Sequence, residues 1–262
     1  MHRFIFANMN GLKPVARSGV VLVGIASFGG CKESPEARIA ELRAMARNPG
    51  TAEIRRVEAA LSDGSADVRA TSLTLMAQID PARAAEAARR ALDDGEGVVR
   101  ATAVRILAPH PDDPLIVRFT SLGSSDPVWQ VRSAALAALA PVEGEPVRAV
   151  FEQALADANR EVRRAALSAG SARPGLLTTA AVAQVLAKDE DWENRVLAAE
   201  ILGGSSDPEA FAPLDEAVLD PHEFVRAAAT RARQALVRSG AARPAPPPAS
   251  PPPDTTKRPP GV

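Results

Sequence analysis

An aspartate followed six residues later by an arginine recurs six times along this 262-residue chain, at a nearly constant interval. Successive arginines are 31 or 32 residues apart, and the pairs are Asp63 and Arg69, Asp94 and Arg100, Asp126 and Arg132, Asp157 and Arg163, Asp189 and Arg195, and Asp220 and Arg226. A segment of this length cannot bury an apolar face alone, so the period predicts six similar units that stack on one another.

The residues around each pair predict two helices per unit. A leucine precedes every aspartate, and small or apolar residues follow the arginine at helical spacing, as in Ala134, Ala135 and Leu136. Valine stands directly before the arginine in five units, whereas the fifth unit has Asn194. Each unit is therefore expected to be a helix, a turn at the aspartate and a second helix. Asp80–Pro81 and Asp207–Pro208 have the pattern of helix starts, and Gly170, Gly203 and Gly204 fall where second helices are expected to end.

The composition agrees with an all-α chain. Apolar residues make up 46% of it but aromatic residues only 3%, and tyrosine is absent. The core must therefore consist largely of Ala, Leu and Val, and the abundant Ala, Leu, Arg and Glu are good helix formers.

The repeated pattern L-x-D-x-x-x-x-V-R-x-x-A-x-x-A-L resembles the short bacterial form of the HEAT repeat over about residues 51–238. This resemblance implies a right-handed α-solenoid of about six helical hairpins, with a surface that suits a protein or peptide segment. The aspartate is expected to cap the second helix, and the arginine to reach the aspartate of its own or the adjoining unit. We call these twelve residues the ladder and interpret them as structural.

The only cysteine, Cys31, suggests where the protein is located. Before it come basic residues (Lys13, Arg17), an apolar stretch over 19–28 that is too short to span a bilayer, and Gly29–Gly30. This region resembles a bacterial lipoprotein signal, although Phe28 stands where leucine is usual. The resemblance implies that Cys31 is diacylated, becomes the new N-terminus and anchors the chain to a membrane. The alternatives are an ordinary secretory signal with an incidental free cysteine, or an uncleaved anchor, and Met9 is an alternative start to Met1.

We therefore divide the chain into four parts. Residues 1–30 are the expected signal peptide, and 31–50 hold the lipidated cysteine, a linker and an N-terminal capping helix. Residues 51–238 form the solenoid. Residues 239–262 are an expected disordered tail, with nine prolines among 243–262.

Few side chains in the sequence are suited to catalysis. Beyond residue 30 there are two histidines, His110 and His222, and no phosphate-binding loop or zinc-ligand spacing. His222–Glu223 resembles one His-Glu motif of deoxyhypusine hydroxylase, which needs four. We therefore expect no metal, no cofactor and no enzymatic activity. Without residues 1–30 the chain has 28 basic and 32 acidic residues, which argues against a nucleic-acid partner.

The rare aromatic residues are the candidate partner contacts. Trp129 and Trp192 lie three residues before their ladder arginines, and His222 and Phe224 occupy the corresponding turn of the sixth unit. They are expected on one rim of the solenoid, either as anchors for a partner or, the interpretation we favour, packed onto neighbouring turns.

The sequence thus predicts a non-catalytic, membrane-tethered scaffold of the bacterial cell envelope that binds a protein or peptide. It would be exported and lipid-anchored, in the outer membrane or on the outer face of the inner membrane. The alternatives are a structural or assembly subunit of an envelope complex, or an accessory to an envelope enzyme.

Overall fold

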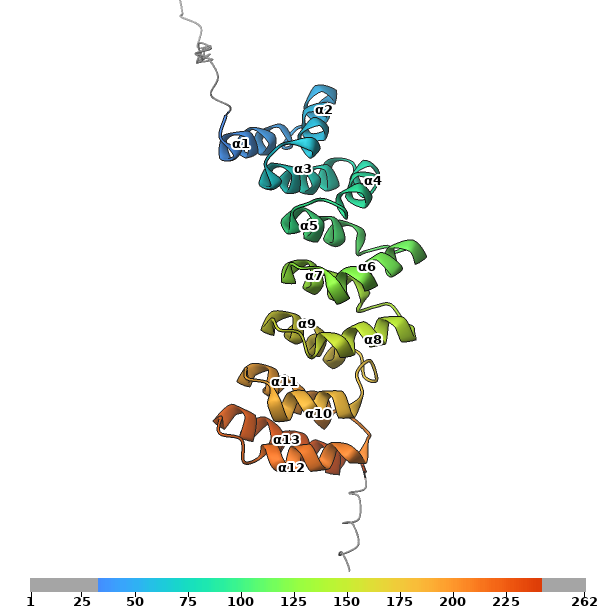
Figure 1. Ribbon diagram of the computed structural model, residues 1–262, viewed down its shortest axis with the longest axis vertical. Helices are drawn as coiled ribbons and strands as arrows, with labels where there is room; N and C mark the ends of the chain where they lie inside the picture. Colours follow the sequence, from blue (N-terminus) through green and yellow to red (C-terminus); the bar gives the residue numbers. More distant parts are fainter. Residues whose placement is uncertain (1–32, 242–262) are drawn as a thin grey trace, which may run out of the picture. The chain divides into compact units, whose positions relative to one another are not determined.

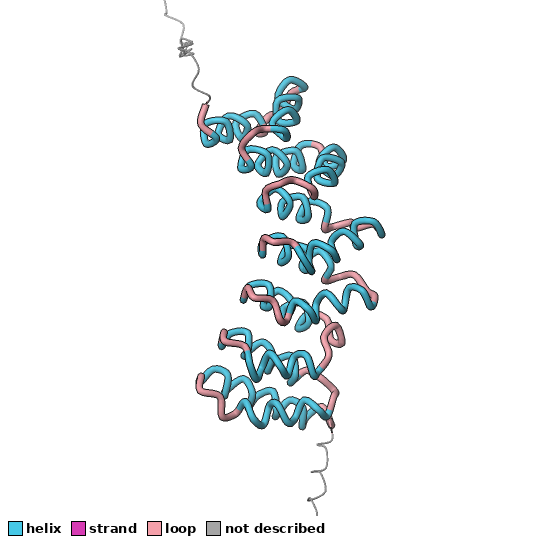
Figure 2. The backbone as a smooth tube through the Cα atoms, in the orientation of Figure 1, coloured by secondary structure: helices cyan, strands magenta, loops and turns pink. Residues whose placement is uncertain are grey.

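The computed structural model of the protein describes residues 33–241, and the helices within this range stack in chain order (Figure 1). The expected signal peptide, Cys31 and nearly all of the proline-rich tail lie outside the described residues. Every regular element between residues 33 and 241 is a helix (Figure 2). The prediction of an all-α solenoid is confirmed.

The first helices of the six units form one layer. They are α2 (Thr51–Ala59), α4 (Pro81–Ala91), α6 (Asp113–Ser125), α8 (Glu145–Ala154), α10 (Thr179–Lys188) and α12 (Phe211–Ala217), with short 3₁₀ turns at Ala60–Ser62 after α2 and Pro208–Ala210 before α12. Asp80 caps α4 by accepting a hydrogen bond from the Arg83 N–H at 3.1 Å, with Pro81 in the first turn. Such capping explains why α4 begins at Asp80–Pro81.

The second helices form the other layer, and each packs on the second helix of the next unit. They are α3 (Ala66–Ile79), α5 (Gly97–Leu107), α7 (Trp129–Leu139), α9 (Arg160–Ala172), α11 (Trp192–Gly203) and α13 (Glu223–Arg238). A further helix, α1 (Pro35–Met45), packs on α3 in the same way.

The core lies between the two layers and consists mainly of Ala, Leu and Val. Phe119 and Phe151 are the largest side chains that are fully buried in it. Small side chains let neighbouring helices approach closely, and this arrangement aligns all the turns that carry the ladder aspartates along one edge of the stack.

Candidate protein-binding surface

Each ladder aspartate shapes the turn that starts a second helix. Its Oδ1 accepts a hydrogen bond from the backbone N–H two residues later, for example from Val128 to Asp126 at 2.9 Å and from His222 to Asp220 at 2.7 Å. The other four aspartates accept the same bond, at 2.8–2.9 Å. This turn reverses the chain and satisfies an N–H group next to the helix start.

Each ladder arginine joins two units. Arg100 donates from Nε and Nη2 to the two carboxylate oxygens of Asp126 in the next unit, both at 2.8 Å, and from Nη1 to the backbone carbonyl of Asp94 in its own unit, also at 2.8 Å. Arg69, Arg132, Arg163 and Arg195 make the same three contacts with the aspartates on either side of them. The side-chain partner is thus the adjoining unit's aspartate, a point that the sequence left open.

The ladder extends one step beyond the six units found in the sequence. Arg38 in α1 donates from Nη2 to Asp63 Oδ1 at 3.0 Å. Arg38 also precedes Arg69 by 31 residues, so α1 corresponds to the second helix of an incomplete seventh unit. The Asp–Arg pattern missed it because position 32, six residues earlier, is lysine. The 31-residue spacing of the arginines alone would have found it.

The central ladder pairs are shielded from water. Arg100 and Asp126 are 8% and 6% exposed. Burial raises the pKa of the Asp126 carboxyl, but the hydrogen bonds from Arg100 and from the Val128 N–H outweigh it, so the pKa lies below its ordinary value. The hydrogen bond to Asp126 likewise raises the pKa of Arg100. Both groups are therefore charged at neutral pH, as a bidentate ion pair requires.

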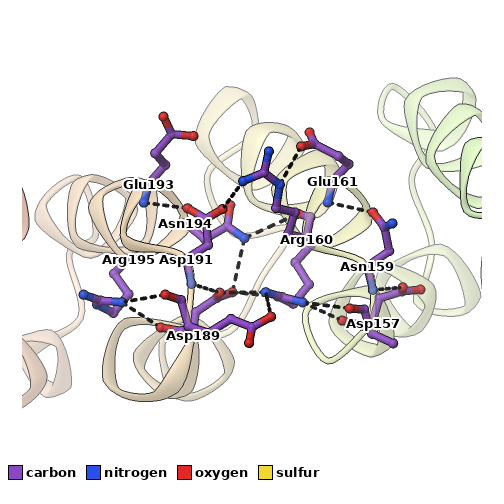
Figure 3. A network of polar contacts seen from close by, with 12 residues as sticks. Asp157, Asn159, Arg160, Glu161, Asp189, Asp191, Glu193, Asn194 and Arg195 are labelled. Atoms are coloured by element: carbon purple, nitrogen blue, oxygen red, sulfur yellow. Dashed lines mark hydrogen bonds and ion pairs between the residues drawn. The ribbon is translucent and has the colours of Figure 1, made fainter.

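The junction between the fourth and fifth units holds an additional polar network (Figure 3). Asn194 occupies the place of the repeated valine and is fully buried. Its Nδ2 donates to Asp189 Oδ2 at 3.2 Å and to the Arg160 carbonyl at 3.4 Å. Its Oδ1 is buried and has no hydrogen-bond partner among the described residues.

Three of the four predicted contact residues come together at the last two units. The rings of Trp192 and His222 stack with centroids 4.3 Å apart and planes 11° apart, and Phe224 packs against both at 5.4 and 5.6 Å. Trp192 also packs on the core, whereas Phe224 is 55% exposed. We call Trp192, His222 and Phe224 the aromatic cluster.

Trp129 lies apart from the cluster, at the first position of α7, and is 37% exposed. It occupies in the third unit the place that Trp192 occupies in the fifth, so both lie along the edge formed by the ladder turns. The structure therefore presents aromatic surface on this rim at two separate points.

Among residues 33–241, no three His, Cys, Asp or Glu side chains are grouped so that they could hold a metal ion. In the same range, no helix combines the length and the apolar character needed to cross a bilayer.

Two layers of paired helices, locked by a repeated Asp–Arg contact, define a helical-repeat protein. A family model described as HEAT repeats matches residues 54–140 and 178–246, more than half of the chain. The chain therefore belongs to the HEAT-repeat family. No curated protein matches it at a significant level.

Solved structures share this architecture at low sequence identity. The X-ray structure of YibA from Escherichia coli is 18% identical with a TM-score of 0.57, over 81% of each chain. Human deoxyhypusine hydroxylase is 19% identical over 79% of this chain and 92% of its own, with a TM-score of 0.43. The CpcE–CpcF complex of phycocyanin lyase from Nostoc is 17% identical over 81% of this chain and 98% of its own, with a TM-score of 0.40.

The expectation that the chain is not an enzyme is contradicted by these comparisons, because the matched structures include a hydroxylase and a lyase. A fold does not by itself decide function, so few reactive side chains and a repeat fold are not grounds for excluding catalysis. At such identities the likeness shows the fold and does not assign either activity to this chain.

Proposed function

We propose that this protein is a membrane-tethered scaffold of the bacterial cell envelope that binds a protein partner along the rim formed by its ladder turns. The observation that carries the proposal is the exposure of large aromatic side chains on that rim, Trp129 at 37% and Phe224 at 55%. Aromatic residues are the side chains most often found at the energetic centres of protein interfaces. An extended stack of repeats suits an extended protein surface better than a small molecule.

The tether is supported by the sequence before Cys31. A basic region, a short apolar stretch and two glycines precede the chain's only cysteine, an arrangement typical of bacterial lipoprotein signals. Acylation of Cys31 would hold the solenoid at a membrane surface, and a diacyl anchor is sufficient for stable attachment.

Detergent-phase partitioning tests the tether. The native protein is expected in the detergent phase as a chain shortened at its N-terminus, and the Cys31→Ser variant in the aqueous phase at its unprocessed length. Recovery of both proteins in the aqueous phase would contradict the lipid anchor.

Crosslinking of the membrane-bound protein followed by purification tests partner binding. A partner captured through the rim is expected to be lost when Trp129 and Phe224 are both replaced by alanine. The matched control is Val117→Ala. Val117 is 71% exposed but lies on α6, the first helix of the third unit, away from the ladder turns. Loss of the partner in the control, or its retention in the double variant, would contradict the proposed surface. Recovery at fixed stoichiometry would favour the assembly-subunit alternative.

A further inference from the structure

The last arginine of the ladder, Arg226, has no carboxylate partner among the described residues, whereas all the others hold one. Arg226 donates from Nη1 to the carbonyls of Asp220 at 2.9 Å and Pro221 at 3.0 Å, the same anchoring contacts that the internal arginines make. Among residues 33–241 no further helix follows α13, and no carboxylate in this range contacts the Nε and Nη2 of Arg226.

The five internal arginines show what this position is shaped to bind. In each of them Nε and Nη2 hold both oxygens of one aspartate at 2.7–3.0 Å, while Nη1 is fixed by a backbone carbonyl. Because Nη1 of Arg226 is fixed in the same way, its other two nitrogens are already oriented for a bidentate carboxylate. We propose that Arg226 is a binding site for an aspartate or glutamate side chain of an acidic, extended segment of a partner protein. This inference rests on the proposed scaffold function and names the chemistry of its partner.

The charge of the terminal helix favours an acidic ligand. Arg226, Arg231 and Arg238 are all exposed, and none of them pairs with an acid among the described residues. Only Arg233 has such a partner, Asp215 at 3.1 Å. The acidic residue of α13 is Glu223, so the helix carries an excess of positive charge.

The outer face of α13 is not shaped for another repeat. At the preceding junction α11 and α13 approach so closely that a Cβ on Gly203 would lie 2.6 Å from the Cα of Ala232. The corresponding residue of α13, 31 positions later, is the exposed Gln234, whose side chain prevents such an approach. A second molecule of this chain is also disfavoured as the partner that stacks on α13. Its α1 is preceded by Lys32, at the position where an internal unit has the ladder aspartate. An extended segment avoids both obstacles.

The test is a titration of the full chain followed through the Nε–Hε resonances of its arginines by NMR. The probe is a terminally blocked peptide with the sequence of residues 186–194, LAKDEDWEN, which includes Asp189, the natural ligand of Arg163. The control peptide carries the amides, LAKNQNWQN. The resonance of Arg226 is identified by its absence from the Arg226→Gln variant. It is expected to shift saturably with the acidic peptide only, while those of the internal ladder arginines stay in place.

Three variants separate geometry from charge. Arg226→Gln and Arg226→Lys should each weaken binding at least about fivefold, because lysine keeps the charge but not the two parallel donors. Arg238→Gln removes an equal charge without the anchored geometry and should change the affinity less than about twofold. Equal binding of both peptides, wild-type affinity of Arg226→Lys, or a dimer that dissociates in Arg226→Gln would overturn the inference. If the crosslinked partner depends on Trp129 and Phe224 but not on Arg226, the inference fails while the scaffold function stands.

Discussion

Asn194 replaces the valine that precedes the ladder arginine in the other five units, and its hydrogen bonding shows a cost. Five units place valine before the ladder arginine, where it is fully buried or nearly so. At this position Asn194 gains two long hydrogen bonds, at 3.2 and 3.4 Å, but its buried carbonyl oxygen has no hydrogen-bond partner among residues 33–241. An unsatisfied buried polar atom costs about 1–3 kcal/mol, so the asparagine is expected to lower stability.

Replacing Asn194 by the valine of the other units should therefore stabilise the protein. We expect the free energy of unfolding to rise by about 1 kcal/mol, because Asp189 keeps its two bonds from Arg163 and the N–H of Asp191. Urea unfolding followed by circular dichroism measures the change. The reciprocal substitution Val162→Asn in the fourth unit should lower stability by about 2–4 kcal/mol, since it buries a polar group without the Asn194 network. A less stable Asn194→Val protein would show that the two long hydrogen bonds outweigh the orphaned oxygen.

At the level of helices, Gly203 serves close packing between two second helices, whereas its neighbour Gly204 does not. The sequence places Gly170, Gly203 and Gly204 at expected helix ends, yet Gly170 lies inside α9 and Gly203 is the last residue of α11. A Cβ on Gly203 would lie 2.6 Å from both the Cα and the Cβ of Ala232 in α13. Gly204, the next residue, has no atom that close, and its φ of −88° suits any residue.

Gly203→Ala and Gly204→Ala should thus have opposite consequences although the residues are neighbours. The first must push α11 and α13 apart and is expected to destabilise the protein by about 1–3 kcal/mol. The second should leave stability within about 0.5 kcal/mol or raise it slightly by restricting the unfolded chain. Thermal unfolding of both variants gives the comparison. Equal effects would mean that the α11–α13 junction can relax without loss.

The helical hairpins could be predicted from the sequence because the ladder marks the turn and the start of the second helix in every unit. Less regular features could not. The half-unit that contains Arg38 lacks the marker aspartate, and α12 is only seven residues long because a 3₁₀ turn at Pro208–Ala210 precedes it. The stacking of Trp192 on His222 depends on how the fifth unit packs on the sixth, and no local pattern specifies that distance.

For the whole molecule, the ladder ties stability to the charge of six carboxylates, one at each junction from α1 to α13. The pKa of every ladder aspartate lies below the ordinary value of 3.8; for Asp94 the main cause is the hydrogen bond from Arg69 and for Asp63 it is the N–H of Ser65. A carboxyl whose pKa is lower in the folded chain stabilises the fold above its unfolded pKa and loses that contribution as the pH falls through the folded value. The ladder should therefore contribute fully at neutral pH and progressively less below about pH 4.

Acid unfolding should accordingly affect all the units in one pH range, because adjacent repeats stabilise one another through the same contact. Helicity measured by circular dichroism is expected to stay constant from about pH 7 to 5 and to fall in a single transition below about pH 4.

The substitution Asp126→Asn tests whether the charge of the ladder carboxylates causes this transition. It should cost about 2–3 kcal/mol at neutral pH and progressively less in acid, where the wild-type carboxyl is also neutral. Asp67→Asn, at an exposed position of α3, should cost little at any pH. The cost of Asp126→Asn could instead be the same at neutral and acid pH. In that case the carboxylate would stabilise the junction by its shape and hydrogen bonds, and the charge of the ladder would not determine the pH at which the protein unfolds.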